Sequence, residues 1–175
     1  EHFKAPGLID IKMGTLSKAI PAAGGYIAGS PELIDFLRYK ARGSLFSGAL
    51  PAGLVAAAIA SFEIMEKEGA ERVQKLRSII DYFVARLHAE GFDTGTSKTS
   101  IIPIMINDLE KTLRMTKYCF ENGIFIPSAL HPVVPHGKER LRATVTSDHS
   151  KKQIDEAVDV VIAAAKHVGF NHKSM

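Results

Sequence analysis

The sequence predicts an α/β fold, and three observations support this prediction. Short runs in which apolar and polar residues alternate, such as Arg140–Thr146, are typical of strands with one buried face. Other segments carry apolar residues every three or four positions, as residues 70–90 do, which is the pattern of amphipathic helices. Capping residues such as Ser30 and stop signals such as Gly123 separate the two kinds of segment.

Composition restricts the class of protein. With 46% hydrophobic and 23% charged residues, the chain has the balance of an ordinary globular protein. Its formal net charge of +3 is small and dispersed, so we expect no nucleic-acid partner. No apolar run approaches the length of a membrane span. Cys119 is the single cysteine and cannot form an internal disulfide, which favours a reduced, cytoplasmic setting and a buried structural thiol.

Residues 10–29 are the most informative stretch. The alternation of Ile9, Ile11 and Met13 predicts a short strand that is buried on one face. Lys18 follows among small and apolar neighbours, where loss of water would favour a neutral amine able to attack a carbonyl. The hydroxyl of Thr15 is a suitable donor to a phosphate. The alternative is an ordinary loop lysine; a P-loop is excluded because no Ser or Thr follows Lys18.

The rest of the first half predicts helices. Ser30 and Pro31 begin a helix that runs to about residue 41. Its expected buried residues are Leu33, Phe36 and Leu37. Residues 51–67 are apolar almost all round, which predicts a buried core helix. Gly69 is expected to separate it from a surface helix over residues 70–90.

Residues 101–168 predict a β-α-β-β-α order, which suffices for a small two-layer domain. The expected strands cover residues 101–106, 124–126 and 140–146, and Pro103 is expected at an edge or bulge because it cannot donate a ladder hydrogen bond. One helix is expected from the Asp108 cap to about residue 122. A second helix is expected to begin at the Ser150–Gln153 capping box. The first of these helices is expected to turn Leu109, Leu113, Thr116 and Phe120 inward.

The segments around Lys18 also match a known family. Residues 10–19 (DIKMGTLSKA) and 24–29 (GGYIAG) resemble the cofactor-lysine segment of the α-oxoamine synthases. These are pyridoxal-phosphate enzymes of the aspartate-aminotransferase-like fold type I. The resemblance implies pyridoxal 5'-phosphate as cofactor, with Lys18 as the residue that carries it. It also implies that Thr15 contacts the cofactor phosphate.

Two further motifs extend the resemblance. Residues 45–51 (LFSGALP) resemble a family loop that crosses the dimer interface, which implies a homodimer and a contact from Ser47 to the cofactor phosphate of the neighbouring subunit. A local role for Ser47 as a turn or cap donor is equally open. Arg140-Leu-Arg142, followed by Thr146 and His149, resembles the family motif whose second arginine binds the substrate carboxylate. That assigns the carboxylate to Arg142, although one of the two arginines could be structural.

The resemblance implies an activity and a domain organisation. The activity is an acyltransferase that condenses an amino acid with an acyl-CoA or acyl-carrier thioester, usually with loss of carbon dioxide, to give an α-amino ketone. Residues 1–69 correspond to the end of the large domain, 70–99 to a linking helix and loop, and 100–175 to the small C-terminal α/β domain. The chain matches the C-terminal half of the family, so we expect little activity from it alone.

Two alternatives remain open at this stage. One is an aminotransferase or lyase of the same fold type, and the other is a non-catalytic, dimerising fragment. The histidines do not suggest a further alternative function, because their spacing does not indicate a metal site. His131 is expected to be a loop residue, and His149 is expected to lie beside the Ser150 cap.

Overall fold

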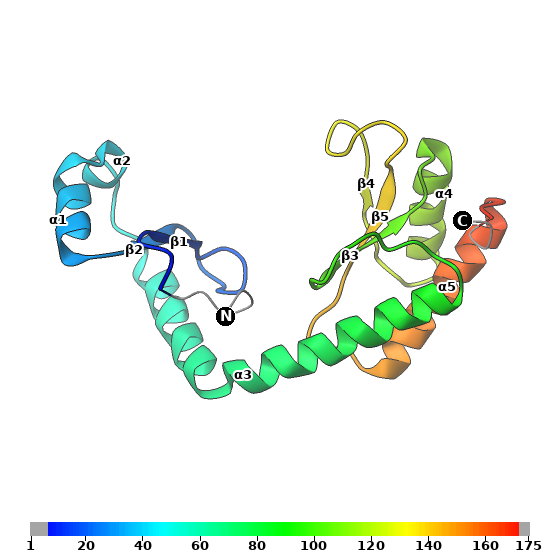
Figure 1. The fold of residues 1–175 in the computed structure, drawn as a ribbon, viewed down its shortest axis with the longest axis horizontal. Helices are drawn as coiled ribbons and strands as arrows, with labels where there is room; N and C mark the ends of the chain where they lie inside the picture. Colours follow the sequence, from blue (N-terminus) through cyan, green and yellow to red (C-terminus); the bar gives the residue numbers. More distant parts are fainter. Residues whose placement is uncertain (1–6, 172–175) are drawn as a thin grey trace. The chain divides into compact units, whose positions relative to one another are not determined.

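The computed structural model describes residues 7–171 and divides the chain into two compact units, residues 1–69 and 70–175, which are described separately (Figure 1). The elements are β1 Lys12–Thr15, β2 Gly25–Ala28, α1 Pro31–Lys40, α2 Arg42–Leu45, α3 Ala52–Ala89, β3 Ile101–Met105, α4 Leu109–Glu121, β4 Ser128–Ala129, β5 Arg140–Thr144 and α5 Lys151–His167. None of the helices within 7–171 has both the length and the apolar character that crossing a membrane requires.

The second unit contains a three-stranded antiparallel sheet in the order β3-β5-β4. Its central strand, β5, turns Leu141 and Ala143 inward, and Val145 follows on the same buried face. α4 packs against α5 and against β4 and β5. These elements, with the last turns of α3, enclose the main hydrophobic core, which includes Phe83, Leu87, Ile102, Ile104, Met115, Val158 and Val161.

Several predicted boundaries of the second unit are confirmed. β3 is an edge strand, and Pro103 pairs with Arg142 there without having to donate a ladder hydrogen bond to a further strand. Asp108 caps α4 by accepting from the Lys111 amide at 2.9 Å. Ser150 and Gln153 form the predicted capping box.

The predicted strand at residues 124–126 is wrong. The chain forms no ladder there, and the pairing with β5 falls at Ser128 and Ala129 instead. Ile126 is buried and Ile124 packs against the core, so the apolar pattern that suggested a strand reflects a loop packed on the core. Alternation alone cannot distinguish these two cases.

The predicted break at Gly69 is also wrong, because α3 continues through it as a helix of 38 residues. A glycine in a helix interior costs only about 1 kcal/mol relative to alanine. Its neighbours Lys67, Glu68 and Ala70 are good helix formers, which offsets that cost.

The inward face of α4 differs from the prediction. Of the four residues predicted to face inward, Leu109, Leu113 and Phe120 are exposed and Thr116 is half-buried, whereas the buried residues are Thr112, Met115 and Cys119. α4 carries two apolar stripes, and packing on the sheet decides which one is buried. Thr112 is tolerated inside because its hydroxyl donates to the Asp108 carbonyl at 2.6 Å. The burial of Cys119 confirms the expected structural thiol and raises its pKa to about 11.

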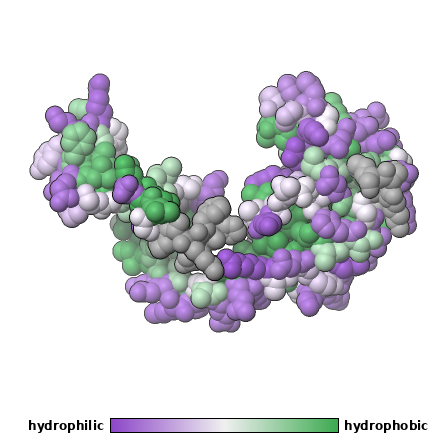
Figure 2. All heavy atoms as spheres, in the orientation of Figure 1, coloured by the Kyte–Doolittle hydropathy of each residue, from purple (hydrophilic) through white to green (hydrophobic). Residues whose placement is uncertain are grey.

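The first unit buries much less than the sequence predicts. Its buried cluster consists of Leu16, Ile20 and Ala58. Hydrophobic side chains gather instead on the visible surface around β1 and β2 (Figure 2). The residues expected inside but exposed include Ile9, Ile11, Met13, Phe36, Val55, Ile59, Phe62 and Met65. A two-stranded sheet and short helices provide too little opposing surface to cover these side chains.

A polar cluster joins α3 to α5 within the second unit. The Tyr82 hydroxyl donates to both Asp155 carboxylate oxygens, at 2.8 and 2.9 Å. Arg86 Nε donates to Oδ1 of the same carboxylate at 2.8 Å. The hydrogen bond from Tyr82, followed by that from Arg86, lowers the pKa of Asp155.

This cluster predicts an acid-dependent loss of stability. Because the pKa of Asp155 is lower in the folded chain, its contribution is fully present above the ordinary carboxyl pKa and disappears as the pH falls through the folded value. Urea unfolding at a series of pH values should show this loss below about pH 4. Asp155→Asn should remove this part of the pH dependence; an unchanged acid limb in the variant would contradict the assignment.

The buried face of α4 predicts a second result. Met115→Ala should lower the free energy of unfolding by about 2–5 kcal/mol, because it opens a cavity in the core. The matched control, Leu113→Ala on the exposed face of the same helix, should change it by less than about 1 kcal/mol. Urea unfolding followed by circular dichroism measures both. Equal losses of unfolding free energy in the two variants would show that Leu113 is buried, as the sequence predicted.

Candidate functional site

The predicted cofactor-lysine segment folds as a hairpin. β1 and β2 pair antiparallel, with Gly14 opposite Tyr26 and Thr15 opposite Gly25. The glycines allow a close approach: a Cβ on Gly25 would lie 2.8 Å from the Gly14 carbonyl oxygen, and one on Gly14 would lie 2.5 Å from the Tyr26 ring. Gly25 is therefore the position that requires glycine, because its neighbour is backbone, whereas the Tyr26 ring beside Gly14 can turn away.

The loop between these strands carries Lys18. Backbone bonds close the loop, from the Leu16 amide to the Gly24 carbonyl at 2.9 Å and from the Ala22 amide to the Leu16 carbonyl at 2.8 Å. Leu16 and Ile20 are buried beside Ala58 in the small cluster of the first unit. Lys18 thus lies midway between two apolar anchors, which fix its backbone.

The side chain of Lys18 is exposed, so the expected burial of this amine is wrong for the chain as described. The physical reason is the direction of the loop: Leu16 and Ile20 take the inward positions, and Lys18 between them faces away from the cluster. Within residues 7–171 its amine has no hydrogen-bond or ion-pair partner. The amine is therefore available to react, but no part of residues 7–171 shields it from water.

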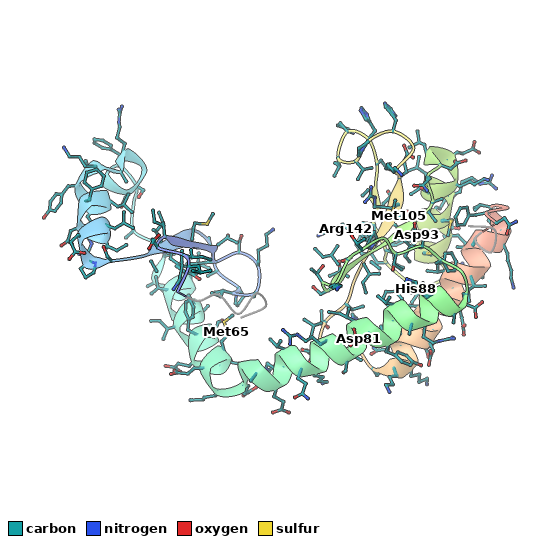
Figure 3. The ribbon with its side chains drawn as sticks, viewed as in Figure 1. Met65, Asp81, His88, Asp93, Met105 and Arg142 are labelled. Atoms are coloured by element: carbon teal, nitrogen blue, oxygen red, sulfur yellow. The ribbon has the colours of Figure 1, made fainter. Side chains whose placement is uncertain are left out.

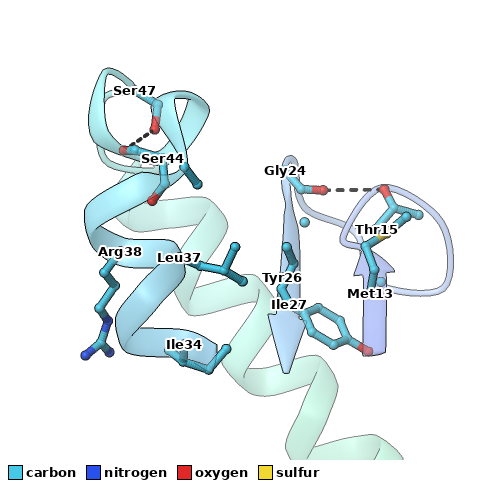
Figure 4. A pocket seen from close by; sticks show the side chains of 13 residues that line it. Met13, Thr15, Gly24, Tyr26, Ile27, Ile34, Leu37, Arg38, Ser44 and Ser47 are labelled. Atoms are coloured by element: carbon cyan, nitrogen blue, oxygen red, sulfur yellow. Dashed lines mark hydrogen bonds between the residues drawn. The ribbon is translucent and has the colours of Figure 1, made fainter. Parts of the chain in front are cut away.

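Thr15 places its hydroxyl at the base of the same loop. Its Oγ1 lies 3.0 Å from the Ser17 hydroxyl and accepts a long bond of 3.4 Å from the Ser17 amide. It also donates to the Gly24 carbonyl at 3.4 Å (Figure 4). Two adjacent hydroxyls are thus held together, and both are exposed donors of the kind that a phosphate oxygen accepts from.

A pocket of about 660 Å³ lies beside this hairpin and brings Thr15 and Ser47 together in its wall (Figure 4). Lys18 does not belong to the wall. The lining residues come from β1, β2, α1 and the segment around α2: Met13, Gly14, Thr15, Gly24, Gly25, Tyr26, Ile27, Ile34, Leu37, Arg38, Ala41, Ser44 and Ser47. Tyr26 and Arg38 were not predicted as site residues, because no pattern in their segments marks them as pocket residues.

Ser47 has a local bond in this chain. Its hydroxyl donates to the Ser44 carbonyl at 3.1 Å, which is the turn role left open by the sequence. The hydroxyl oxygen retains its acceptor capacity, and rotation about χ1 would free its proton for another acceptor.

Arg142 lies in the second unit, on the exposed face of β5 (Figure 3). Its guanidinium has no hydrogen-bond or ion-pair partner in the described part of the chain. Arg140, on the same strand face, donates from Nε to the Lys138 carbonyl at 2.8 Å. Arg142 therefore has its whole guanidinium available for a carboxylate, whereas Arg140 has only its two terminal nitrogens available.

His149 has a structural role. His149 accepts a hydrogen bond from the Thr146 amide through Nδ1 at 3.0 Å, immediately before the Ser150 cap, as expected. Between residues 7 and 171, no group of three or more His, Cys, Asp and Glu side chains could hold a metal ion.

Comparisons with known proteins show what the chain resembles. The family model "Aminotransferase class I and II" matches residues 3–161. An 8-amino-7-oxononanoate synthase from Thermosipho melanesiensis is 42% identical over 169 residues, which are 97% of this chain and 43% of that protein. The chain therefore spans less than half the length of this relative.

Solved structures give the same result for the fold. A structure of SPT with its PLP internal aldimine has a TM-score of 0.90 and 27% identity, over 98% of this chain and 43% of that one. Serine palmitoyltransferase from S. paucimobilis with a bound PLP–myriocin aldimine has a TM-score of 0.88 and 25% identity over the same shares. The predicted family resemblance, fold class and family cofactor are confirmed by these matches.

The hairpin geometry makes a prediction that is independent of any ligand. Gly25→Ala should push β1 and β2 apart, since its Cβ meets backbone that cannot rotate away. Such overpacking costs about 1–3 kcal/mol, so hydrogen exchange of the Leu16 amide, whose acceptor is Gly24, should become roughly tenfold faster. Gly43→Ala is the control, because a Cβ there meets nothing within 4 Å. Equal protection in both variants would show that the hairpin tolerates the extra carbon.

Proposed function

The chain belongs to the class I and II aminotransferase family, and we propose that it functions within a pyridoxal-phosphate-dependent acyltransferase. The proposed reaction joins an amino acid to an acyl thioester, with loss of carbon dioxide, and forms an α-amino ketone. The 42% identity to an 8-amino-7-oxononanoate synthase supports this class of reaction over other reactions of the fold. The acyl chain and the amino acid are left open.

The observation that carries the proposal is the position of Lys18. Its amine is exposed and without a partner in the described chain, on a loop pinned by Leu16 and Ile20. Thr15 begins this loop and lines the adjacent pocket with Ser47. An amine for an aldehyde and hydroxyl donors for a phosphate are the groups that pyridoxal phosphate requires, so these residues fit the cofactor.

Each residue then has a stated task. Thr15 would hold the phosphate of the cofactor bound to its own subunit, and Ser47 would contact the cofactor phosphate of the neighbouring subunit in the proposed homodimer. Lys18 Nζ would hold the cofactor aldehyde and, when free and neutral, accept the proton from the α-carbon of the amino acid. The bound cofactor supplies an electron sink for that carbanion. Arg142 would orient the substrate carboxylate through two parallel hydrogen bonds.

We propose that Lys18 is shielded from water by parts of the protein that lie outside these 175 residues. The Thermosipho relative is more than twice as long, since the matched part is 43% of it. We place there the walls that desolvate the amine and the acidic partner of the cofactor ring. The 175-residue chain by itself should accordingly show little activity, and we propose that the complete enzyme works as a homodimer with Ser47 near the subunit interface.

Two other functions remain distinguishable by assay. An aminotransferase or lyase of this fold would not release coenzyme A thiol from a mixture of amino acid and acyl-CoA, whereas the proposed acyltransferase would. A non-catalytic, dimerising fragment would not be labelled at Lys18 in the intact protein.

The labelling experiment makes the sharpest prediction. Borohydride reduction of the intact protein with pyridoxal phosphate should attach one phosphopyridoxyl group to Lys18, found by peptide mass spectrometry. Lys18→Ala should abolish the label, because no other amine lies between Leu16 and Ile20. Lys12→Ala, which removes an exposed lysine from β1, should leave it unchanged.

The phosphate contact is tested in the same assay. Thr15→Ala should require several-fold more pyridoxal phosphate for half-maximal labelling, whereas Thr15→Ser, which retains the hydroxyl, should stay close to the original protein. Labelling spread over several lysines, or undiminished in Lys18→Ala, would refute the proposed function.

A further inference from the structure

The loop between β4 and β5 holds two histidines face to face. The rings of His131 and His136 are parallel within 9°, with centroids 3.8 Å apart. Both side chains are exposed, and Val133 between them is 83% exposed. Within residues 7–171 the two rings belong to no group of three or more side chains that could hold a metal ion.

The loop is anchored at its base. The Val134 amide donates to the Leu130 carbonyl at 3.2 Å, and the Lys138 amide donates to the Pro135 carbonyl at 3.1 Å. Glu139 is only 4% exposed, and its carboxylate accepts from the Gly137 amide at 3.1 Å. Its carbonyl accepts from the amides of residues 106 and 107, which follow β3. The stacked rings therefore project from a fixed support.

The charge around the stack is one-sided. Residues 128–142 contain three cations, Lys138, Arg140 and Arg142, and a single carboxylate, that of Glu139. That carboxylate is buried and turned to the Gly137 amide, so it does not face a ligand at the surface. Lys138 is exposed, and Arg140 uses Nε for the Lys138 carbonyl, which leaves its terminal nitrogens available. The loop thus carries a ring stack and, within four residues of His136, the two cations Lys138 and Arg140.

We propose that the β4–β5 loop binds a nucleotide, with the base stacked on the His131–His136 pair and phosphate groups paired with Lys138 and Arg140. Planar bases stack on aromatic side chains regardless of sequence, and cations hold the phosphates beside them. The inference rests on the proposed function only for the source of the nucleotide, which would be the nucleotide part of the acyl donor. An acidic protein surface would engage the cations but would have no use for a parallel ring stack, so the nucleotide is favoured.

The test follows the imidazole protons of the full 175-residue chain by NMR while adenosine 3',5'-bisphosphate is added. The Cε1 protons of His131 and His136 should shift upfield, because a stacked base places them in its ring current. The resonances of His88 and His149 are internal controls and should not move, since these side chains belong to other segments. The measurement needs neither pyridoxal phosphate nor turnover, so its failure is separate from failure of the proposed function.

Matched variants separate stacking from charge. Replacing both histidines by alanine should weaken binding at least about fivefold. His136→Phe retains a ring and should recover most of the affinity, which also guards against a merely misfolded loop. Lys138→Gln should weaken binding and reduce its dependence on salt, whereas Lys152→Gln on α5 should do neither.

Any one of the following outcomes would overturn the proposal. These are unshifted His131 and His136 resonances, equal shifts of His149, full affinity in the double alanine variant, and equal binding of inorganic pyrophosphate, which lacks a base. Binding of poly-glutamate without binding of the nucleotide would point to an acidic protein partner and would also refute it.

Discussion

Burial of one face of β5 is the constraint on which the second unit depends. Leu141, Ala143 and Val145 alternate along the chain, and all three lie in the core. Because side chains alternate across a strand, burying this face sends Arg140 and Arg142 to the other side. The same packing between β3 and β4 fixes the register in which Arg142 lies opposite Pro103. The hydrophobic core thereby positions the arginine that we assign to the substrate carboxylate.

The first unit, in contrast, buries few apolar side chains and leaves many exposed. Three small or medium side chains form its buried cluster, and two of them, Leu16 and Ile20, flank Lys18. This limited burial is nevertheless placed where it fixes the reactive loop. Around it, apolar residues of β1, α1 and α3 remain exposed. Relatives in which the matched region is 43% of the length have additional sequence with which such surfaces could be covered.

The loop that carries Lys18 and the loop between β4 and β5 are held in place by different interactions. The Lys18 loop is held by backbone bonds and two apolar anchors. The β4–β5 loop is held by a buried carboxylate, Glu139, which satisfies a backbone amide from within. A buried carboxylate that accepts a hydrogen bond is costly to disturb. Both supports leave the functional side chain itself unengaged, as binding requires.

The sequence alone determined the class of fold, the caps at Ser30, Asp108 and Ser150, and the segment that carries Lys18 and Thr15. These features depend on local rules, namely capping geometry, side-chain period and a contiguous motif. Only the tertiary structure decided that α4 buries Met115 and not Leu113, that Gly69 does not break α3, that Lys18 is exposed in this chain, and that His131 meets His136. Each of these depends on which surfaces come into contact, and contacts between segments distant in sequence leave no trace in local periodicity.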